Sequence, residues 1–87
     1  MAYGIRIRPS ALKELGRIPA RDGARIEARI DGLAGEPRPH GSEKMEGGER
    51  AYRVRVGNYR VIYTVDDAAK AVMVEKIGHR GDVYRRR

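Results

Sequence analysis

One stretch carries the strongest structural signal in this chain: Tyr52-Arg53-Val54-Arg55-Val56-Gly57-Asn58-Tyr59-Arg60-Val61-Ile62-Tyr63-Thr64-Val65. Two runs of β-branched and aromatic residues flank Gly57-Asn58, and glycine tolerates the positive φ that a two-residue hairpin loop requires. The stretch therefore predicts a β-hairpin. A two-residue loop also fixes its register, with the facing pairs Val56–Tyr59, Arg55–Arg60, Val54–Val61, Arg53–Ile62 and Tyr52–Tyr63.

The alternation along this hairpin separates an apolar face from a basic face. The apolar face suits a core and consists of Tyr52, Val54, Val56, Tyr59, Val61, Tyr63 and Val65. The other face carries Arg53, Arg55 and Arg60. Like charges directly opposite each other weaken a hairpin, so the three arginines are either solvated groups that keep the sheet soluble or a site for an anion. Among anions, phosphate fits best because its oxygens match the guanidinium fork.

Length and charge narrow the class of protein. The 87 residues allow a single domain, residues 1–87, with a small core. The formal net charge of +7 indicates nucleic acid or an acidic protein as a partner, with a membrane surface as a weaker third option. No apolar run is long enough to span a bilayer and no signal-peptide pattern opens the chain, so we expect a cytoplasmic protein. Without cysteine and with two histidines, the sequence predicts no disulfide, metal site or cofactor.

The rest of the chain predicts a strand and two helices before the hairpin and one strand after it. We expect a strand over 3–8, helices over 10–16 and 19–34, a loop without periodicity over 35–51, a last strand over 71–77 and a short helical C-terminal tail. Two consecutive helices ahead of a meander favour packing on one face of the sheet. The predicted fold is α+β: two N-terminal helices on one face of a small, mainly antiparallel, four-stranded sheet, with the arginines on the open face.

The hairpin, followed by Ile77-Gly78-His79-Arg80-Gly81-Asp82-Val83-Tyr84, resembles the RelE/ParE superfamily of type II toxins, on its RelE side. The likeness covers essentially the full length, including the segment Lys44-Met45-Glu46-Gly47. It implies a toxin that inhibits translation by entering the A site of the 70S ribosome and cutting mRNA. In RelE-like enzymes the ribose 2′-hydroxyl attacks the adjacent phosphate without a metal ion.

The resemblance also implies roles for particular residues. Arg53 and Arg55 fall where the family places basic residues on a strand, and Arg60 where an arginine stabilises charge on the phosphate. Arg80 corresponds to a residue that assists the leaving group, and Tyr84 to a tyrosine that contacts the substrate nucleotide. The expected catalytic residues are Arg55, Arg60, Arg80 and Tyr84, and the expected RNA-binding residues are Arg53, Lys44 and Arg85.

The identity of the proton acceptor stays open at this point. Some relatives have lysines in place of Arg53 and Arg55, and arginine is effectively never deprotonated, so neither is a credible general base. His79 is a candidate acid or base because its ordinary pKa suits the task, although a lone histidine after a strand is more often a hydrogen-bonding bystander. We expect Glu43, Glu46 and Glu49 to be solvated carboxylates of the loop.

Two other functions remain alternatives: a ParE-like inhibitor of DNA gyrase, and a non-catalytic basic RNA-binding domain. The partners implied by the resemblance are a cognate antitoxin, mRNA and the ribosome, and no membrane. We expect the antitoxin to fold an acidic or amphipathic segment over the basic face.

Overall fold

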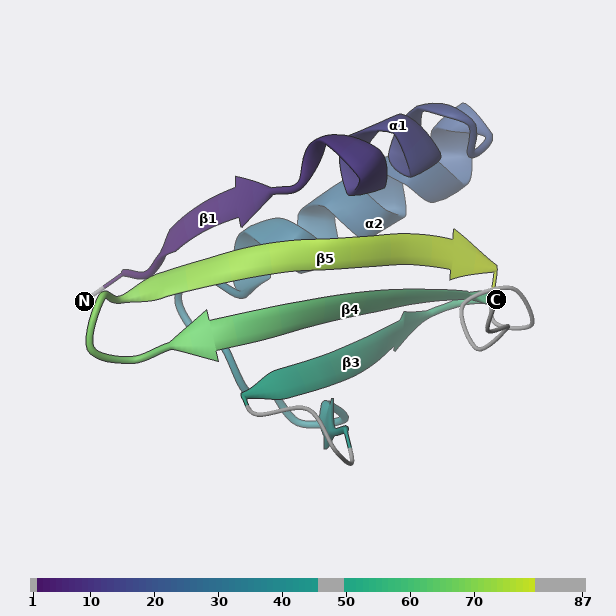
Figure 1. The fold of residues 1–87 in the computed structure, drawn as a ribbon. Coiled ribbons are helices and arrows are strands. Elements are labelled where there is room, and N and C mark those ends of the chain that lie inside the picture. The colour runs from purple at the N-terminus through teal and green to yellow at the C-terminus, as the bar shows by residue number, and fades with distance from the viewer. Residues whose placement is uncertain (1, 46–49, 80–87) are drawn as a thin grey trace.

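The computed structural model describes residues 2–45 and 50–79, which form two helices and a five-stranded sheet (Figure 1). The elements in chain order are β1 (Gly4–Ile7), α1 (Pro9–Gly16), α2 (Ala20–Gly32), β2 (Glu43–Lys44), β3 (Ala51–Val56), β4 (Tyr59–Asp66) and β5 (Ala71–His79). The predicted α+β class and the pair of N-terminal helices are confirmed. The predicted helical tail lies outside the described residues.

The β3–β4 hairpin has the register that the sequence predicted. Val56 faces Tyr59, Arg55 faces Arg60, and the pairing continues to Ala51 and Thr64. The φ of Gly57 is +60°, and no other residue of the two-residue loop has a positive φ, as in a type II′ turn. This loop closes the hairpin with no insertion, so the two strands hold their side chains in fixed opposition.

The sheet has five strands in the order β1-β5-β4-β3-β2, so the predicted count of four was wrong. The additional strand is β2, in which Glu43 faces Arg53 and Lys44 faces Tyr52. Two residues are too few to show the period-2 alternation from which strands are recognised. In the described sheet β1 pairs with β5 in parallel, and the other three pairs are antiparallel.

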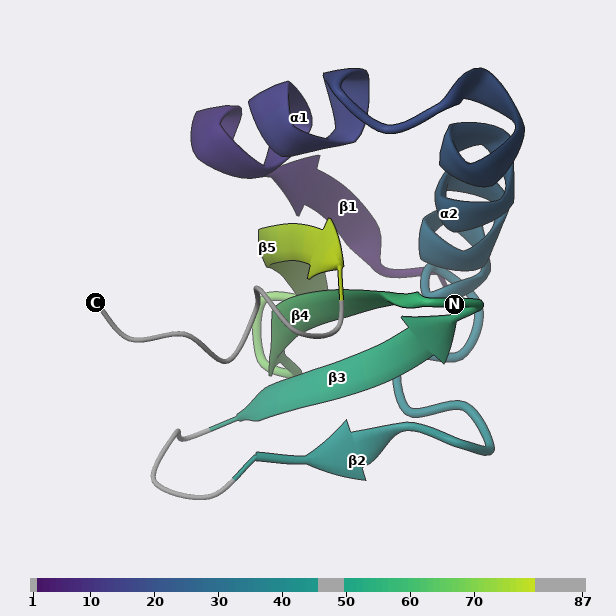
Figure 2. The same ribbon diagram turned by 90° about the vertical axis from the view of Figure 1, so that its right-hand side faces the viewer.

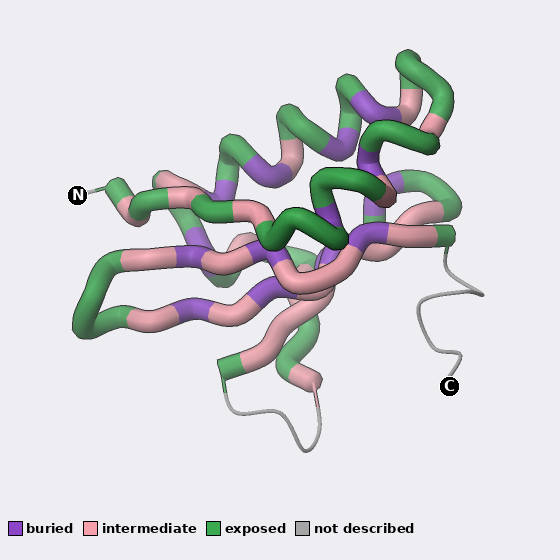
Figure 3. Tube along the Cα trace, turned by 45° about the horizontal axis from the view of Figure 1, so that its top comes forward, coloured by how far each residue is buried: buried purple, intermediate pink, exposed green. Residues whose placement is uncertain are grey.

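Both helices cover the same face of the sheet (Figure 2). They supply Ala11 and Leu15 from α1 and Ile26 and Ile30 from α2 to a buried core. The strands supply the other side of that core, and buried positions alternate with more exposed ones along them (Figure 3). They contribute Val54, Val56, Val61, Tyr63, Val65, Val72, Val74 and Ile77. In the described part of the chain, no helix covers the opposite face of the sheet, called the open face below.

The segment between α2 and β2 is fixed by side chains of the sheet. The buried Tyr63 hydroxyl donates a hydrogen bond of 2.7 Å to the Pro37 carbonyl oxygen, and burial raises the pKa of Tyr63. The Arg38 guanidinium donates to the Tyr52 hydroxyl at 2.9 Å and lies over the Tyr52 ring. These contacts determine where the chain enters β2. Within the described part of the chain, neither helix is long and apolar enough to cross a membrane.

Candidate functional site

Three arginines of the hairpin lie together on the open face. Arg53 and Arg55 come from β3, and Arg60 comes from β4 directly opposite Arg55. With Gly41 and Glu43 they line a pocket of about 200 Å³, called the arginine pocket below. The strands place these side chains here because residues two apart share a face of a strand. The structure therefore brings together three of the seven residues expected to bind RNA or act in catalysis.

Glu43 brings a carboxylate into the arginine pocket. Its Oε1 accepts a hydrogen bond of 2.7 Å from Nε of Arg53 and forms an ion pair of 2.7 Å with Nη2 of the same guanidinium. The expected loop position was wrong for Glu43, because pairing of β2 with β3 sets it opposite Arg53. The expected exposure to solvent is confirmed, since the side chain is 63% exposed. The formal charges of the four ionic side chains sum to +2 when three guanidiniums and one carboxylate are counted.

The size and charge of the arginine pocket suit one anionic group. Pockets that enclose a drug-sized ligand usually measure roughly 300–1,000 Å³, and this pocket is smaller at about 200 Å³. It lies on an open sheet face, so a longer polymer can extend past it. Guanidinium groups stay charged at all physiological pH values and bind phosphate oxygens through paired N–H donors. The size and charge of the pocket are thus suited to one phosphate group.

Two other predicted residues do not join the arginine pocket. His79 pairs with Tyr59 at the end of β5, and its ring meets the Tyr59 ring edge-on with centroids 5.8 Å apart. Because Tyr59 packs against the core, this pairing places His79 on the helix side of the sheet. Lys44 pairs with Tyr52, which also packs against the core, and so lies on the same helix side.

The remaining predicted residues cannot be placed. Arg80, Tyr84 and Arg85 lie outside the described residues, as does Glu46. Their roles stay predictions. Among residues 2–45 and 50–79, no three His, Asp or Glu side chains gather in a way that could hold a metal ion.

A second ionic cluster, absent from the sequence prediction, anchors the segment that leads to β2. Arg38 Nη2 forms an ion pair of 2.7 Å with Asp67, and the Tyr3 hydroxyl donates a 2.7 Å hydrogen bond to the same carboxylate. The Arg38 guanidinium, assisted by Tyr3, lowers the pKa of Asp67 to about 2. The contact joins residues 29 positions apart in the chain, and no periodicity in the sequence connects them. By fixing Arg38, the cluster supports the position of β2 beside the arginines.

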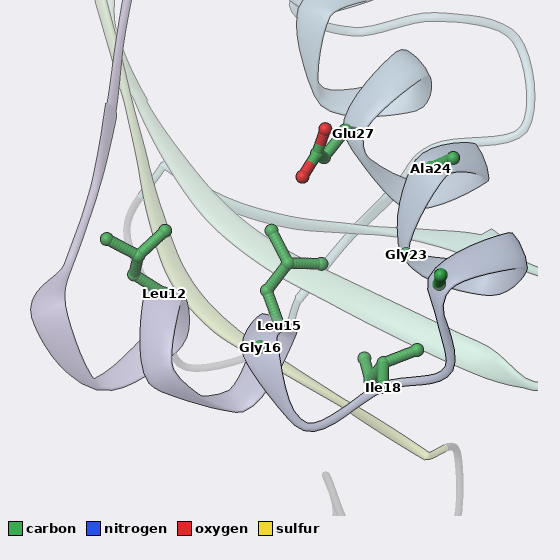
Figure 4. A pocket seen from close by; sticks show the side chains of 8 residues that line it. Leu12, Leu15, Gly16, Ile18, Gly23, Ala24 and Glu27 are labelled. Atoms are coloured by element: carbon green, nitrogen blue, oxygen red, sulfur yellow. The ribbon is translucent and has the colours of Figure 1, made fainter.

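The helix layer offers an apolar groove between α1 and α2 (Figure 4). Leu12, Leu15 and Ile18 extend into it from the α1 side, and Ala24 and Glu27 border it on α2. Its volume is about 730 Å³. Among the described residues, Leu12 is a large hydrophobic residue that is exposed, with 56% of its surface accessible to solvent. Exposed apolar surface of this kind is typical of protein contacts, and it lies on the opposite side of the sheet from the arginine pocket.

Comparison with known proteins gives consistent matches over nearly the whole chain. Residues 5–84 match the family described as "ParE toxin of type II toxin-antitoxin system, parDE". The chain is 31% identical to "Toxin RelG" of Mycobacterium tuberculosis, over 99% of this chain and 100% of RelG. It is 27% identical to "Putative toxin RelE1" of Methanocaldococcus jannaschii, over 98% of both chains.

The fold also matches solved structures. The crystal structure of the archaeal RelE–RelB complex from Pyrococcus horikoshii contains a chain that is 34% identical, with a TM-score of 0.83. The match covers 93% of this chain and 98% of that one. The arrangement of two helices on a mixed five-stranded sheet is therefore the fold found in these relatives.

Proposed function

This chain belongs to the RelE/ParE family of type II toxins, and we propose that it is a RelE-type endoribonuclease that cleaves mRNA in the A site of the ribosome. Cleavage in the A site inhibits translation. The observation that carries this proposal is the opposition of Arg55 and Arg60 across the hairpin, with Arg53 beside them in the arginine pocket.

The facing pair Arg55–Arg60 does not contribute to the stability of the hairpin. Cross-strand like charges destabilise a sheet, while guanidinium groups around one phosphate are stabilised by it. Sites where sequence and stability disagree are commonly functional. The arrangement is accounted for if the pocket holds a phosphate of RNA.

The proposed chemistry uses this charge in the transition state. The ribose 2′-oxygen loses its proton and bonds to the adjacent phosphorus, while the bond from phosphorus to the 5′-oxygen breaks. The products are a 2′,3′-cyclic phosphate and a 5′-hydroxyl. Negative charge builds on the phosphoryl oxygens during attack, and donors fixed on a rigid hairpin stabilise it without reorganisation.

The arginines cannot take the proton of the 2′-hydroxyl. In the proposed mechanism Arg55 and Arg60 act by electrostatics, Arg53 binds RNA in the pocket, and the ribosome fixes the geometry of attack. Lys44 lies on the helix side of the sheet, so it would bind RNA only outside the arginine pocket. Arg80 assists the leaving 5′-oxygen, Tyr84 contacts the substrate nucleotide, and Arg85 adds attraction to RNA. His79 remains a candidate acid or base, although its place on the helix side of the sheet gives it no direct route to the arginine pocket.

The proposed partners are mRNA, the ribosome and a cognate antitoxin, met in the cytoplasm. Support for the antitoxin comes from the Pyrococcus horikoshii relative, whose structure is a RelE–RelB complex. The net charge of +7 favours an antitoxin with an acidic segment that covers the basic face.

A ParE-like inhibitor of DNA gyrase is the second candidate, because the matching family is described by its ParE member. Such a protein would act through protein contact and would not need a phosphate pocket. An assay for RNA cleavage and an assay for gyrase activity therefore distinguish the two functions.

The test is primer extension on a defined mRNA incubated with purified protein, with and without translating ribosomes, beside a gyrase supercoiling assay. We expect cuts at A-site codons that require ribosomes, and no change in supercoiling. Inhibited supercoiling without RNA cuts would reject the nuclease in favour of the ParE-like function.

A further inference from the structure

The arginine pocket already contains an anionic group from the chain itself. Glu43 Oε1 lies 2.7 Å from both Nε, by a hydrogen bond, and Nη2, by an ion pair, of the Arg53 guanidinium. The same residue lines the pocket with Arg55 and Arg60. Paired N–H donors of one guanidinium are the groups that would bind two oxygens of a phosphate. The carboxylate thus engages the donors that the substrate needs.

We propose that Glu43 is an internal competitor for the substrate phosphate, which must displace this carboxylate from Arg53 to bind. The proposal rests on the proposed function, since it takes the arginine pocket to be the site of the RNA phosphate. Glu43 thereby lowers affinity for RNA in general. Binding then depends more strongly on a substrate that is already held in place by the ribosome.

The structure allows this displacement without loss of the fold. Glu43 lies on a two-residue strand at the edge of the sheet, and its side chain is 63% exposed. The buried core contains no residue of β2. An ion pair at this exposure contributes little to stability because water screens it. The carboxylate can leave Arg53 while the hairpin keeps its register.

A purely structural role for the ion pair makes a different prediction. If Glu43 served only to hold β2 on β3, its removal would loosen the edge strand and leave RNA affinity unchanged or reduced. Competition predicts the reverse, because neutralising Glu43 raises the formal charge of the pocket from +2 to +3. Affinity for a single-stranded oligonucleotide therefore distinguishes the two roles.

The test uses the Glu43→Gln variant of the full chain and a fluorescent 2′-O-methyl oligoribonucleotide, which lacks the attacking hydroxyl and cannot be cut. Fluorescence anisotropy should show binding about two- to fivefold tighter than wild type, the range expected for one exposed ion pair. The dependence of log K on log salt should steepen by up to about 0.7, one charge on a single strand. The matched control is Glu27→Gln on α2, which removes the same charge on the other side of the sheet and should change both quantities less.

A double-mutant cycle with Arg53→Ala tests whether the effect passes through Arg53. In the Arg53→Ala background, Glu43→Gln should give a smaller gain, because the carboxylate has no Arg53 guanidinium left to occupy. Equal or weaker binding of Glu43→Gln with a normal unfolding temperature would overturn the competition, as would a gain equal to that of Glu27→Gln. Failure of the proposed function would look different. The Arg55→Ala variant would bind the oligonucleotide as tightly as the wild-type protein, and the wild-type protein would leave mRNA uncut on ribosomes.

Discussion

Arg55 and Arg60 face each other across the hairpin, and like charges in facing positions repel each other. Their guanidinium groups stay charged at any physiological pH, so the conflict cannot be relieved by loss of a proton. Stability and activity commonly oppose each other in this way at functional sites. At the scale of single residues, we therefore propose that binding of an anion, not folding, determines the choice of side chain in the arginine pocket.

This conflict gives a prediction of opposite sign for stability and activity. We expect Arg55→Thr to raise the free energy of unfolding by about 0.2–1 kcal/mol, because it removes a cross-strand like-charge pair and threonine suits a strand. The same change should slow ribosome-dependent cleavage. Urea unfolding and primer extension on the same preparation measure the two effects, and a variant that is both less stable and fully active would contradict this explanation of the pair.

The position of Glu43 beside Arg53 could not be predicted from the sequence. Arg53, Arg55 and Arg60 were predicted to share a patch because they alternate along a recognised hairpin, and the structure confirms that they do. Glu43 lies outside any periodic segment, so nothing in its sequence neighbourhood connected it with Arg53. Its place became visible only when β2 was seen to pair with β3.

At the scale of elements, the β3–β4 hairpin carries the site and was predictable in register. Its two-residue loop with glycine at the first position leaves one arrangement for the facing pairs. The parallel pairing of β1 with β5 was not predictable in the same way, because it joins segments distant in sequence. The strand β2 was missed because it is only two residues long. Local alternation determines a hairpin, whereas the edges of a sheet depend on tertiary contacts.

The loop of the hairpin supplies a second prediction. Gly57 has a φ of +60°, and a Cβ there would meet Arg25 Nη1 at 3.6 Å, an ordinary contact. The penalty for Gly57→Ala is therefore conformational, and we expect the free energy of unfolding to fall by about 1–2 kcal/mol. Chemical denaturation measures this change.

Gly32→Ala at the end of α2 is the matched control for that substitution. A Cβ at Gly32 would meet no atom within 4 Å, and its φ is not in the left-handed region. Alanine favours a helix over glycine, so this variant should be unchanged or more stable by up to about 1 kcal/mol. Equal losses at both positions would show that the loop conformation is not the cause.

At the scale of the whole molecule, the hydrophobic core and the arginine pocket lie on opposite faces of the sheet. The helices bury the apolar face of the sheet, which leaves the opposite face to the arginines (Figure 2). This division was predictable from the order of the elements and from the alternation of the hairpin. The sequence did not indicate that His79 and Lys44 fall on the helix side, because that depends on the pairing of β5 and β2.

The formal net charge of +7 acts over a longer range than the arginine pocket. A net positive field attracts RNA and the ribosome over distances longer than any one contact, and salt weakens it. The field supplies attraction without selecting a particular phosphate. In the proposed function, the fixed arginines of the hairpin select the phosphate. The activity should therefore depend far more on one arginine of the pocket than on an equally charged arginine elsewhere on the sheet.

The most direct test of this account compares Arg60→Ala with Arg6→Ala by primer extension on mRNA in translating ribosomes. Arg6 is an exposed arginine on β1, at the opposite edge of the sheet from β2, so both variants lose one positive charge. We expect Arg6→Ala to cut A-site codons at nearly the wild-type rate, and Arg60→Ala to be slower by about 10²- to 10³-fold, as for loss of one donor to a transition-state anion. Equal rates for the two variants, with both folded, would contradict the central claim that the arginine pocket stabilises the cleaved phosphate.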